Sequence, residues 1–231
     1  MTYLLEVEDL SCTVPGRTLF ADLSFSLSAG ESIAIVGRSG VGKSTLLAAI
    51  MGLRNVAHGD IRILGESMVS AKAKRKREIR RERLGIVHQD GQLIDELTAV
   101  ENVAVALMLV KDQLPELWEE AEKRLTAIGV PPHTLASKLS GGEIQRTALV
   151  RALASQPSVI LADEPTGSLD EETRDAVAQQ LFSATRDAQA ALVIVTHDPA
   201  IAAYANKVLV LPVCQPCCES VSGRCCCWVR G

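Results

Sequence analysis

Residues 37–45 have the composition and spacing of a phosphate-binding loop, in which a Gly-Lys-Ser triplet closes a glycine-rich segment. They follow an apolar run, Ile33–Val36, and precede a predicted helix, Leu46–Met51, which is the context that this motif requires. Glycines let the backbone N–H groups surround a phosphate, and the helix N-terminus attracts the same anion. We expect Lys43 to reach the β- and γ-phosphates of ATP and the Ser44 hydroxyl to ligate Mg²⁺; the alternative is a chance glycine-rich turn. The residues of this segment expected to bind the nucleotide are Gly37, Ser39, Gly40, Gly42, Lys43, Ser44 and Thr45.

Two adjacent carboxylates, Asp163 and Glu164, follow a second apolar run, Val159–Ala162. The carboxyl ends of strands in an open α/β sheet face one crevice, so we expect both side chains to lie near the phosphate-binding loop. Asp163 would support the Mg²⁺ shell, and Glu164 would polarise the water that attacks the γ-phosphate. An Asp-Glu pair is usually surface charge, but its position directly after a buried strand disfavours that reading.

A second candidate anion site is the Ser-Gly-Gly sequence at 140–142, which opens a predicted helix that ends near Gln156. Ser140 is suited to the N-cap position, and the glycines leave backbone amides open to an anion. Taken alone, this pattern favours a helix that is well capped and binds nothing. One nucleotide needs only one cradle, however, so a second anion site predicts that ATP lies between two copies of the chain.

These segments form an ordered set with Gln89, Ser168-Leu169-Asp170 and His197, and the set resembles the ATP-binding subunit of ABC transporters over about Met1–Val213. Within that family, the short length and the Ala-Asp-Glu-Pro-Thr-Gly sequence at 162–167 resemble the lipoprotein-release and macrolide-export type.

The resemblance implies roles for residues that spacing alone does not explain. Ser140 and Gly142 of one copy would close on the γ-phosphate held by the other copy, and Asp170 would help to join the two sites. Gln89 would contact Mg²⁺ or the attacking water and relay to a membrane partner. His197 would contact the γ-phosphate.

The implied function is that of an ATPase that uses ATP and Mg²⁺ and works as a homodimer under a separate permease to drive export or release. An alternative is an ABC-type ATPase of a non-transport envelope or cell-division complex. A third possibility is a nucleotide-binding module that no longer hydrolyses ATP. The presence of Lys43, Glu164 and His197 argues against that module.

The elements that would position these residues can also be predicted. Leu23, Phe25 and Leu27 alternate with serines, which predicts a strand of a small antiparallel layer. The two apolar runs named above and a third, Ala191–Val195, predict buried parallel strands.

The pattern turns helical over about residues 90–156. Thr98 and Glu101 have capping-box spacing, and another helix is predicted to start at Pro115. The expected fold is α/β: a P-loop NTPase with a mostly parallel sheet core, an N-terminal antiparallel β layer and an inserted helical subdomain.

Composition limits the partners and the location. Only 3% of the chain's 231 residues are aromatic, so the core must be aliphatic. The net charge of −4 argues against nucleic acid as a partner. The only strong charge run, Lys72–Arg83, is read as a solvated helix face. No signal peptide or membrane span is recognisable, so we expect a cytoplasmic protein held on the membrane through its permease.

Val14 stands where the family usually has an aromatic residue that stacks on adenine. Loss of such stacking predicts ATP affinity lower by about tenfold or more, unless Tyr3 or Phe20 substitutes. His88 stands where the family usually has Phe, and Glu143-Ile144 replaces the commoner Gln-Gln; neither change removes a phosphate ligand.

The aliphatic pattern ends at Val213, and no closing strand is expected beyond it. Residues 214–231 form a cysteine-rich tail that we interpret as disordered or as an out-of-frame ending. Cys214 and Cys217 have the spacing of metal ligands, but the remaining cysteines do not form a second such pair.

Overall fold

The computed structural model describes residues 2–109, 114–211 and 228–230. An antiparallel sheet opens the fold and consists of β1 (Leu5–Val14), β2 (Arg17–Leu27), β4 (His58–Ile63) and β5 (Glu66–Ser67), in the order β2-β1-β4-β5. Alternate residues of β2, among them Leu23, Phe25 and Leu27, are buried while the serines between them are more exposed. The predicted antiparallel layer is therefore confirmed.

The second sheet has the order β10-β9-β3-β8-β7-β6. Its strands are β3 (Ser32–Val36), β6 (Leu84–Val87), β7 (Val159–Asp163), β8 (Ala191–Val195), β9 (Lys207–Val210) and β10 (Trp228–Arg230). All neighbouring pairs from β9 to β6 are parallel, and only β10 is antiparallel, to β9. The three apolar runs thus form adjacent central strands, with β3 beside β8 and β8 beside β7.

The central strands are buried on both faces, which explains why they are continuous apolar runs. Ile33 and Ile35 of β3 belong to a core that also contains helix α1 (Lys43–Ile50) and the inner face of the antiparallel sheet. Ala34 belongs to a second core, on the other face. That core is closed by α5 (Gly141–Ala154), α6 (Glu171–Asp187) and the short α7 (Pro199–Ala202).

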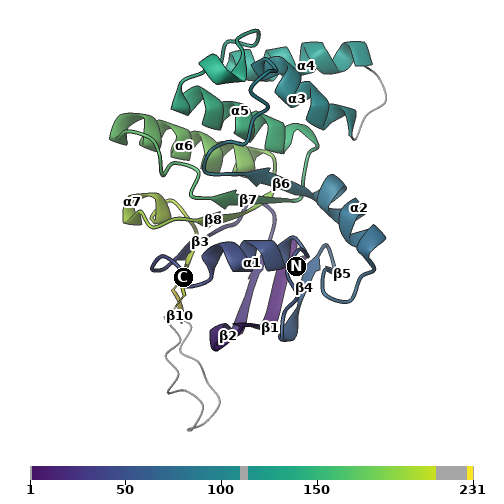
Figure 1. The fold of residues 1–231 in the computed structure, drawn as a ribbon, viewed down its shortest axis with the longest axis vertical. Helices are drawn as coiled ribbons and strands as arrows, with labels where there is room; N and C mark the ends of the chain where they lie inside the picture. The colour runs from purple at the N-terminus through teal and green to yellow at the C-terminus, as the bar shows by residue number, and fades with distance from the viewer. Residues whose placement is uncertain (1, 110–113, 212–227, 231) are drawn as a thin grey trace.

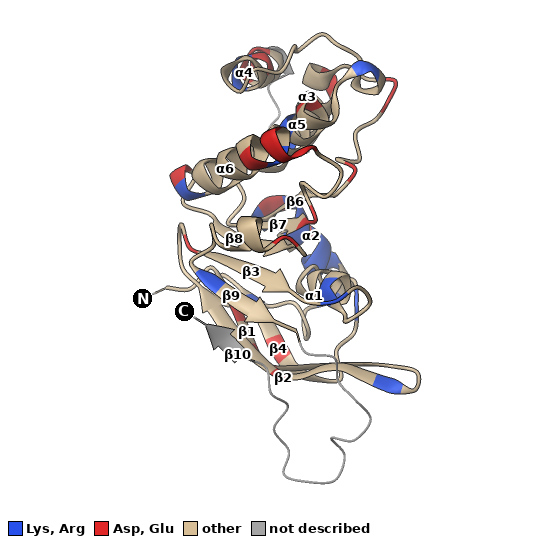
Figure 2. Cartoon of the chain, turned by 90° about the vertical axis from the view of Figure 1, so that its left-hand side faces the viewer, with Lys and Arg blue, Asp and Glu red and all other residues tan. Residues whose placement is uncertain are grey.

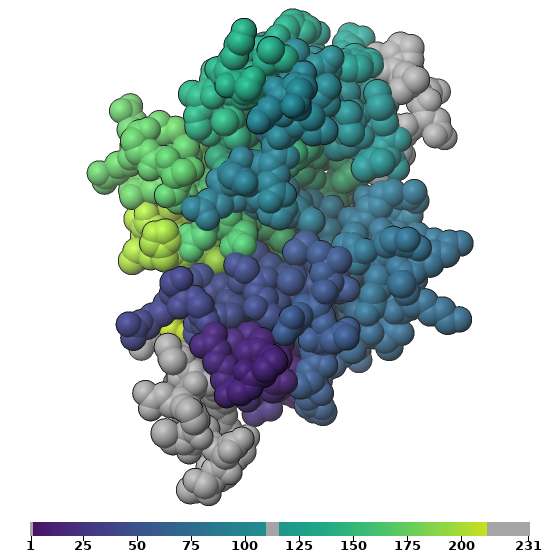
Figure 3. Space-filling model, viewed as in Figure 1, coloured from purple at the N-terminus to yellow at the C-terminus, as the bar shows by residue number. Residues whose placement is uncertain are grey.

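The chain between β6 and β7 is largely helical. It contains α3 (Ala99–Met108), α4 (Leu114–Ala127), the 3₁₀ turn η1 (Ala136–Lys138) and α5. Apolar side chains of α3, α4 and α5 form a third core, and these helices lie together at the top in Figures 1 and 3. Helix α3 begins with the predicted capping box: Glu101 N donates to the Thr98 hydroxyl, and Thr98 N donates to the Glu101 carboxylate.

Helix α2 (Ala73–Arg83) carries the basic run, and Figure 2 shows the concentration of Lys and Arg on it. Ile79 is its one buried residue, so the prediction of a mostly solvated helix is confirmed. Arg75 forms ion pairs with Glu66 and Glu78, which raise the pKa of its guanidinium above the usual range.

The prediction that no strand follows Val213 is wrong, because β10 pairs with β9 at the edge of the sheet. Sequence pattern could not reveal it, since a three-residue strand has no measurable periodicity. Cys214, Cys217 and the other cysteines of the tail lie outside the described residues. None of the helices in the described part of the chain is long and apolar enough to cross a membrane.

Candidate active site

The phosphate-binding loop joins the end of β3 to the start of α1. Gly42 occupies the N-cap position of α1 with φ 113°, which is a left-handed conformation open to glycine, and no side chain caps the helix. A Cβ at Gly42 would also lie 3.2 Å from Cβ of Leu19. The first N–H groups of α1 therefore remain available to an anion.

Lys43 is the first residue of α1, and its ammonium group lies over the loop. Its Nζ donates to the carbonyl oxygen of Gly37 at 2.8 Å and to that of Arg38 at 3.4 Å. These contacts hold a positive charge at the mouth of the loop, where the helix N-terminus adds its own partial positive charge.

The two predicted carboxylates lie where β7 ends, and Thr196 and His197 follow the end of the neighbouring strand β8. The Glu164 carboxylate accepts hydrogen bonds from His197, 2.8 Å from Nδ1 and 3.3 Å from the main-chain N. Glu164 has φ 46°, an uncommon value for a non-glycine residue, and its N–H donates to the carbonyl of Val195 at 2.9 Å. Backbone conformations of this kind are concentrated at functional sites.

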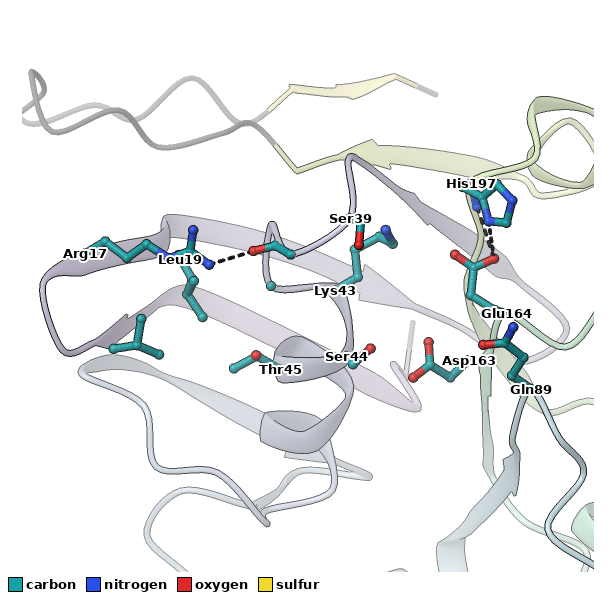
Figure 4. A pocket seen from close by; sticks show the side chains of 13 residues that line it. Arg17, Leu19, Ser39, Lys43, Ser44, Thr45, Gln89, Asp163, Glu164 and His197 are labelled. Carbon is teal, nitrogen blue, oxygen red and sulfur yellow. Dashed lines mark hydrogen bonds and ion pairs between the residues drawn. The ribbon is translucent and has the colours of Figure 1, made fainter. Parts of the chain in front are cut away.

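A single cavity of about 670 Å³ brings most of these groups together (Figure 4). Of the predicted site residues, it is lined by Ser39, Gly40, Gly42, Lys43, Ser44, Thr45, Gln89, Asp163, Glu164 and His197. Gly37 is absent from the lining but binds Lys43 through its carbonyl group. Residues from the loop after β3, from α1, from the end of β7 and from the segments after β6 and β8 thus converge on one space.

The remaining predicted residues, Ser140, Gly142 and Asp170, do not line this cavity among the described residues. Ser140 caps α5 in a reciprocal capping box: Glu143 N donates to its hydroxyl, and Ser140 N donates to the Glu143 carboxylate at 2.8 Å. Gly142 is buried, and a Cβ there would lie 2.6 Å from Cγ2 of Thr173 in α6. Asp170 caps α6 by accepting from Thr173 N, a bond that lowers the pKa of its carboxyl.

Three residues in the cavity lining extend it toward the antiparallel sheet: Val14, Arg17 and Leu19. Arg17 donates to the carbonyl of Gly40 at 2.7 Å (Figure 4). Phe20 is fully buried in the core and Tyr3 is not part of the lining, so neither stands in for the aromatic residue missing at Val14. Arg17 is not among the residues predicted from the sequence, although the neighbouring Pro15-Gly16 turn was an available signal.

Two further residues that the sequence does not predict lie on α5 and hold the segment that carries Gln89. Gln145 and Arg151 donate hydrogen bonds to backbone carbonyls between His88 and Gln92. Side chains that bind main-chain carbonyls leave no pattern in the sequence beyond a polar residue on a buried helix face.

The fold and the cavity define a nucleotide-hydrolysing enzyme built around a phosphate-binding loop. Residues 20–167 match the profile of the ABC transporter family. The chain is 39% identical over 197 residues to the lipoprotein-releasing system ATP-binding protein LolD of Idiomarina loihiensis, which covers 84% of this chain and 86% of that protein. The chain belongs to the ABC transporter family, as one of its ATP-binding and ATP-hydrolysing subunits.

Solved structures of ABC-type ATP-binding proteins have the same fold. The ATP-binding cassette MJ0796, as a dimer in a post-hydrolysis state bound to ADP and Pi, is 29% identical with a TM-score of 0.79 and covers 90% of this chain and 94% of its own. cbiO1 from Clostridium perfringens, part of the ABC transporter complex cbiONQ, is 27% identical with a TM-score of 0.82. The match covers 91% of this chain and 85% of cbiO1. The predicted P-loop fold with its antiparallel layer and parallel core is confirmed.

Proposed function

We propose that the chain is the motor subunit that drives export or release of a lipoprotein, peptide or drug through a separate permease. Two copies would bind ATP between them on the cytoplasmic face of the cell membrane, where the permease holds them. The observation that carries this proposal is one cavity with a complete phosphate loop, two carboxylates and a histidine, in a chain 39% identical to a lipoprotein-releasing ATP-binding protein. In this proposal residues 1–213 form the ATP-binding unit, with residues of about 90–156 as its helical subdomain.

The donors in the cavity suit Mg²⁺, which prefers hard oxygen ligands. The Ser44 hydroxyl, the Asp163 carboxylate and the Gln89 amide oxygen all belong to the cavity lining and would hold the ion. Bound with ATP, Mg²⁺ would neutralise charge that develops on the phosphates.

The protein groups have separate tasks in hydrolysis. Lys43 and the open N-terminus of α1 would bind the β- and γ-phosphates, as their position at the loop supports. Glu164 would accept the proton of the attacking water and hold it in line, and His197, bonded to that carboxylate, would contact the γ-phosphate.

The residues outside the cavity are assigned to the contact between copies. Ser140 and Gly142 at the start of α5 would bind the γ-phosphate held by the second copy, and Asp170 would link the two sites. The dimeric cassette structures support this assignment, because the chain matches them over 90% of its length.

The test is a pull-down of the tagged chain from detergent-solubilised membranes, with the co-purifying proteins identified by mass spectrometry. We expect a multi-spanning permease with a large extracytoplasmic domain. Recovery of soluble partners alone, or of none, would contradict the transport function and favour an ABC-type ATPase of an envelope or cell-division complex.

A further inference from the structure

The segment of residues 88–92 carries Gln89 from the end of β6 into the cavity, and one of its residues, Gln92, has a backbone conformation that its residue type disfavours. Gly91 N donates to the carbonyl of His88 at 3.0 Å, which closes a turn. Gly91 has φ 68°, and Gln92 has φ 46°, a left-handed conformation that is uncommon for a residue with a side chain. At Gln92 the segment therefore depends on contacts from outside for its shape.

Those contacts come from one helix, α5. Gln145 Nε2 donates to the carbonyls of His88 at 3.1 Å and Gln89 at 2.5 Å. The Arg151 guanidinium donates to the carbonyls of Gly91 at 2.6 Å and Gln92 at 2.5 Å. Four carbonyls of a five-residue segment are thus held by two side chains that lie six positions apart on the same helix.

Packing brings the segment against α5 as closely as glycine allows. A Cβ at Gly91 would lie only 2.5 Å from Cγ2 of Ile144, the neighbour of Gln145. Burial lowers the pKa of Arg151 and the negative charge of Asp90 opposes that shift; a guanidinium remains charged in either case. Its bonds to carbonyls are therefore charge-assisted and stronger than bonds between neutral groups.

The cost of these contacts argues that they have a specific role. Gln145 is 2% exposed, and its Oε1 has no hydrogen-bond partner among the described residues. A buried acceptor without a partner destabilises the folded state, and an apolar residue at this position would avoid that cost. The following stretch is held differently: Asn102 of α3, and not α5, binds Ile94, Leu97 and Thr98.

We propose that Gln145 and Arg151 are positioning residues for Gln89, which fix its backbone so that its amide oxygen reaches Mg²⁺ at the site of hydrolysis. The inference rests on the proposed role of Gln89. Because α5 begins at Ser140, the same rigid helix then carries both the second anion site and the placement of Gln89. A displacement of α5 displaces Gln89 with it.

The experiment measures steady-state ATP hydrolysis of the purified full chain carrying Arg151→Met or Gln145→Met. Methionine retains much of the volume and removes the donors. We expect kcat to fall about tenfold in each variant with the KM for ATP within about twofold, because an interaction that matters in the transition state affects kcat. The matched control is Arg124→Met, which removes an arginine that donates to the carbonyl of Leu153 in the last turn of α5 but does not contact residues 88–92, and which should leave kcat unchanged.

A double-mutant cycle with Gln89→Ala separates positioning from a general structural effect. If Arg151 acts through Gln89, Arg151→Met causes no further loss of kcat in the Gln89→Ala background. Full additivity, or an unchanged kcat in both single variants, would overturn the inference. If Gln89→Ala itself leaves kcat unchanged, the proposed role of Gln89 fails instead.

A variant that keeps the charge covers the case in which Arg151→Met does not fold. Arg151→Lys retains a donor but loses the two-pronged guanidinium, so it can hold one of the two carbonyls. We expect it to fold and to lose about threefold in kcat, again only when Gln89 is present. A loss that persists in the Gln89→Ala background would contradict the inference.

Discussion

Two helix N-termini in this molecule are suited to bind phosphate, and they differ in what satisfies them. Helix α1 begins at Gly42 with no side-chain cap and opens into the cavity. Helix α5 begins at Ser140, whose hydroxyl and N–H are bonded to the carboxylate of Glu143. These bonds lower the pKa of Glu143, so the carboxylate is charged at neutral pH.

The difference indicates that the two helix N-termini bind phosphate in different ways. The open end of α1 can bind an anion within one chain, since its N–H groups have no competing side chain. The end of α5 is already supplied with a negative charge from its own first turn, as is common at helix N-termini. A phosphate at α5 must share that end with Glu143, so binding there should be the weaker and later event.

The largest expected effect is at Glu164, the proposed general base in the cavity. Glu164→Gln should lower ATP turnover about 10²–10⁴-fold, which is the range for loss of a general base. With hydrolysis blocked, ATP should hold an α1 end and an α5 end together, so size-exclusion chromatography should show an ATP-dependent dimer. Unchanged turnover would refute the assignment of Glu164 as the base. A Glu172→Gln variant, altered at the start of α6 outside the cavity lining, is the control.

The second largest effect concerns binding of the adenine of ATP rather than of its phosphates. Val14, Arg17 and Leu19 leave the far end of the cavity without an aromatic ring. Val14→Tyr should therefore tighten ATP binding about tenfold, measured by titration calorimetry, because base stacking is worth about 1–3 kcal/mol. An unchanged dissociation constant would mean that the α1 end already supplies the affinity.

How far the sequence predicts these two ends depends on the kind of signal. Gly42-Lys43-Ser44 and Ser140 could be found because backbone N–H groups at helix starts need particular residue types. The short strands β6 and β9 were not predicted, since four residues at the edge of other patterns show no clear period. Gln145 and Arg151 act on main-chain carbonyls, which every residue has, so their partners carry no recognisable sequence. The separation of Ser140 from the cavity also could not be predicted from the sequence, because it depends on how the helices pack against the sheet.

A third prediction tests the α5 end directly. In the Glu164→Gln background, Ser140→Ala should weaken the ATP-dependent dimer by about tenfold or more, since a hydrogen bond to a charged group contributes about 1.5–3 kcal/mol. The chain provides a matched control in Thr98, which caps α3 with the same arrangement, to Glu101, but is not assigned to phosphate. Thr98→Ala should cost similar stability, about 1 kcal/mol, and leave the dimer intact. Equal effects of the two variants on dimerisation would show that Ser140 acts only as the N-cap of α5 and does not bind phosphate.

The smallest effect is expected from Glu143→Gln, which keeps the shape of the cap and removes its charge. Without that charge the ATP-dependent dimer should form about two- to fivefold more tightly, because like charges near a surface repel only modestly.

The same substitution has a defined pH dependence. The folded-state pKa of Glu143 is lowered, so its contribution to stability is present above the unfolded-state pKa and is lost as the pH falls through the folded-state pKa. Wild type should melt at a higher temperature than Glu143→Gln at pH 7, and the two melting temperatures should converge as the pH falls below the ordinary glutamate pKa of about 4. Glu101→Gln should show the same convergence, since its pKa is lowered by the corresponding bonds to Thr98, but no change in dimerisation. A tighter dimer in both variants would show that the effect is not specific to the α5 end.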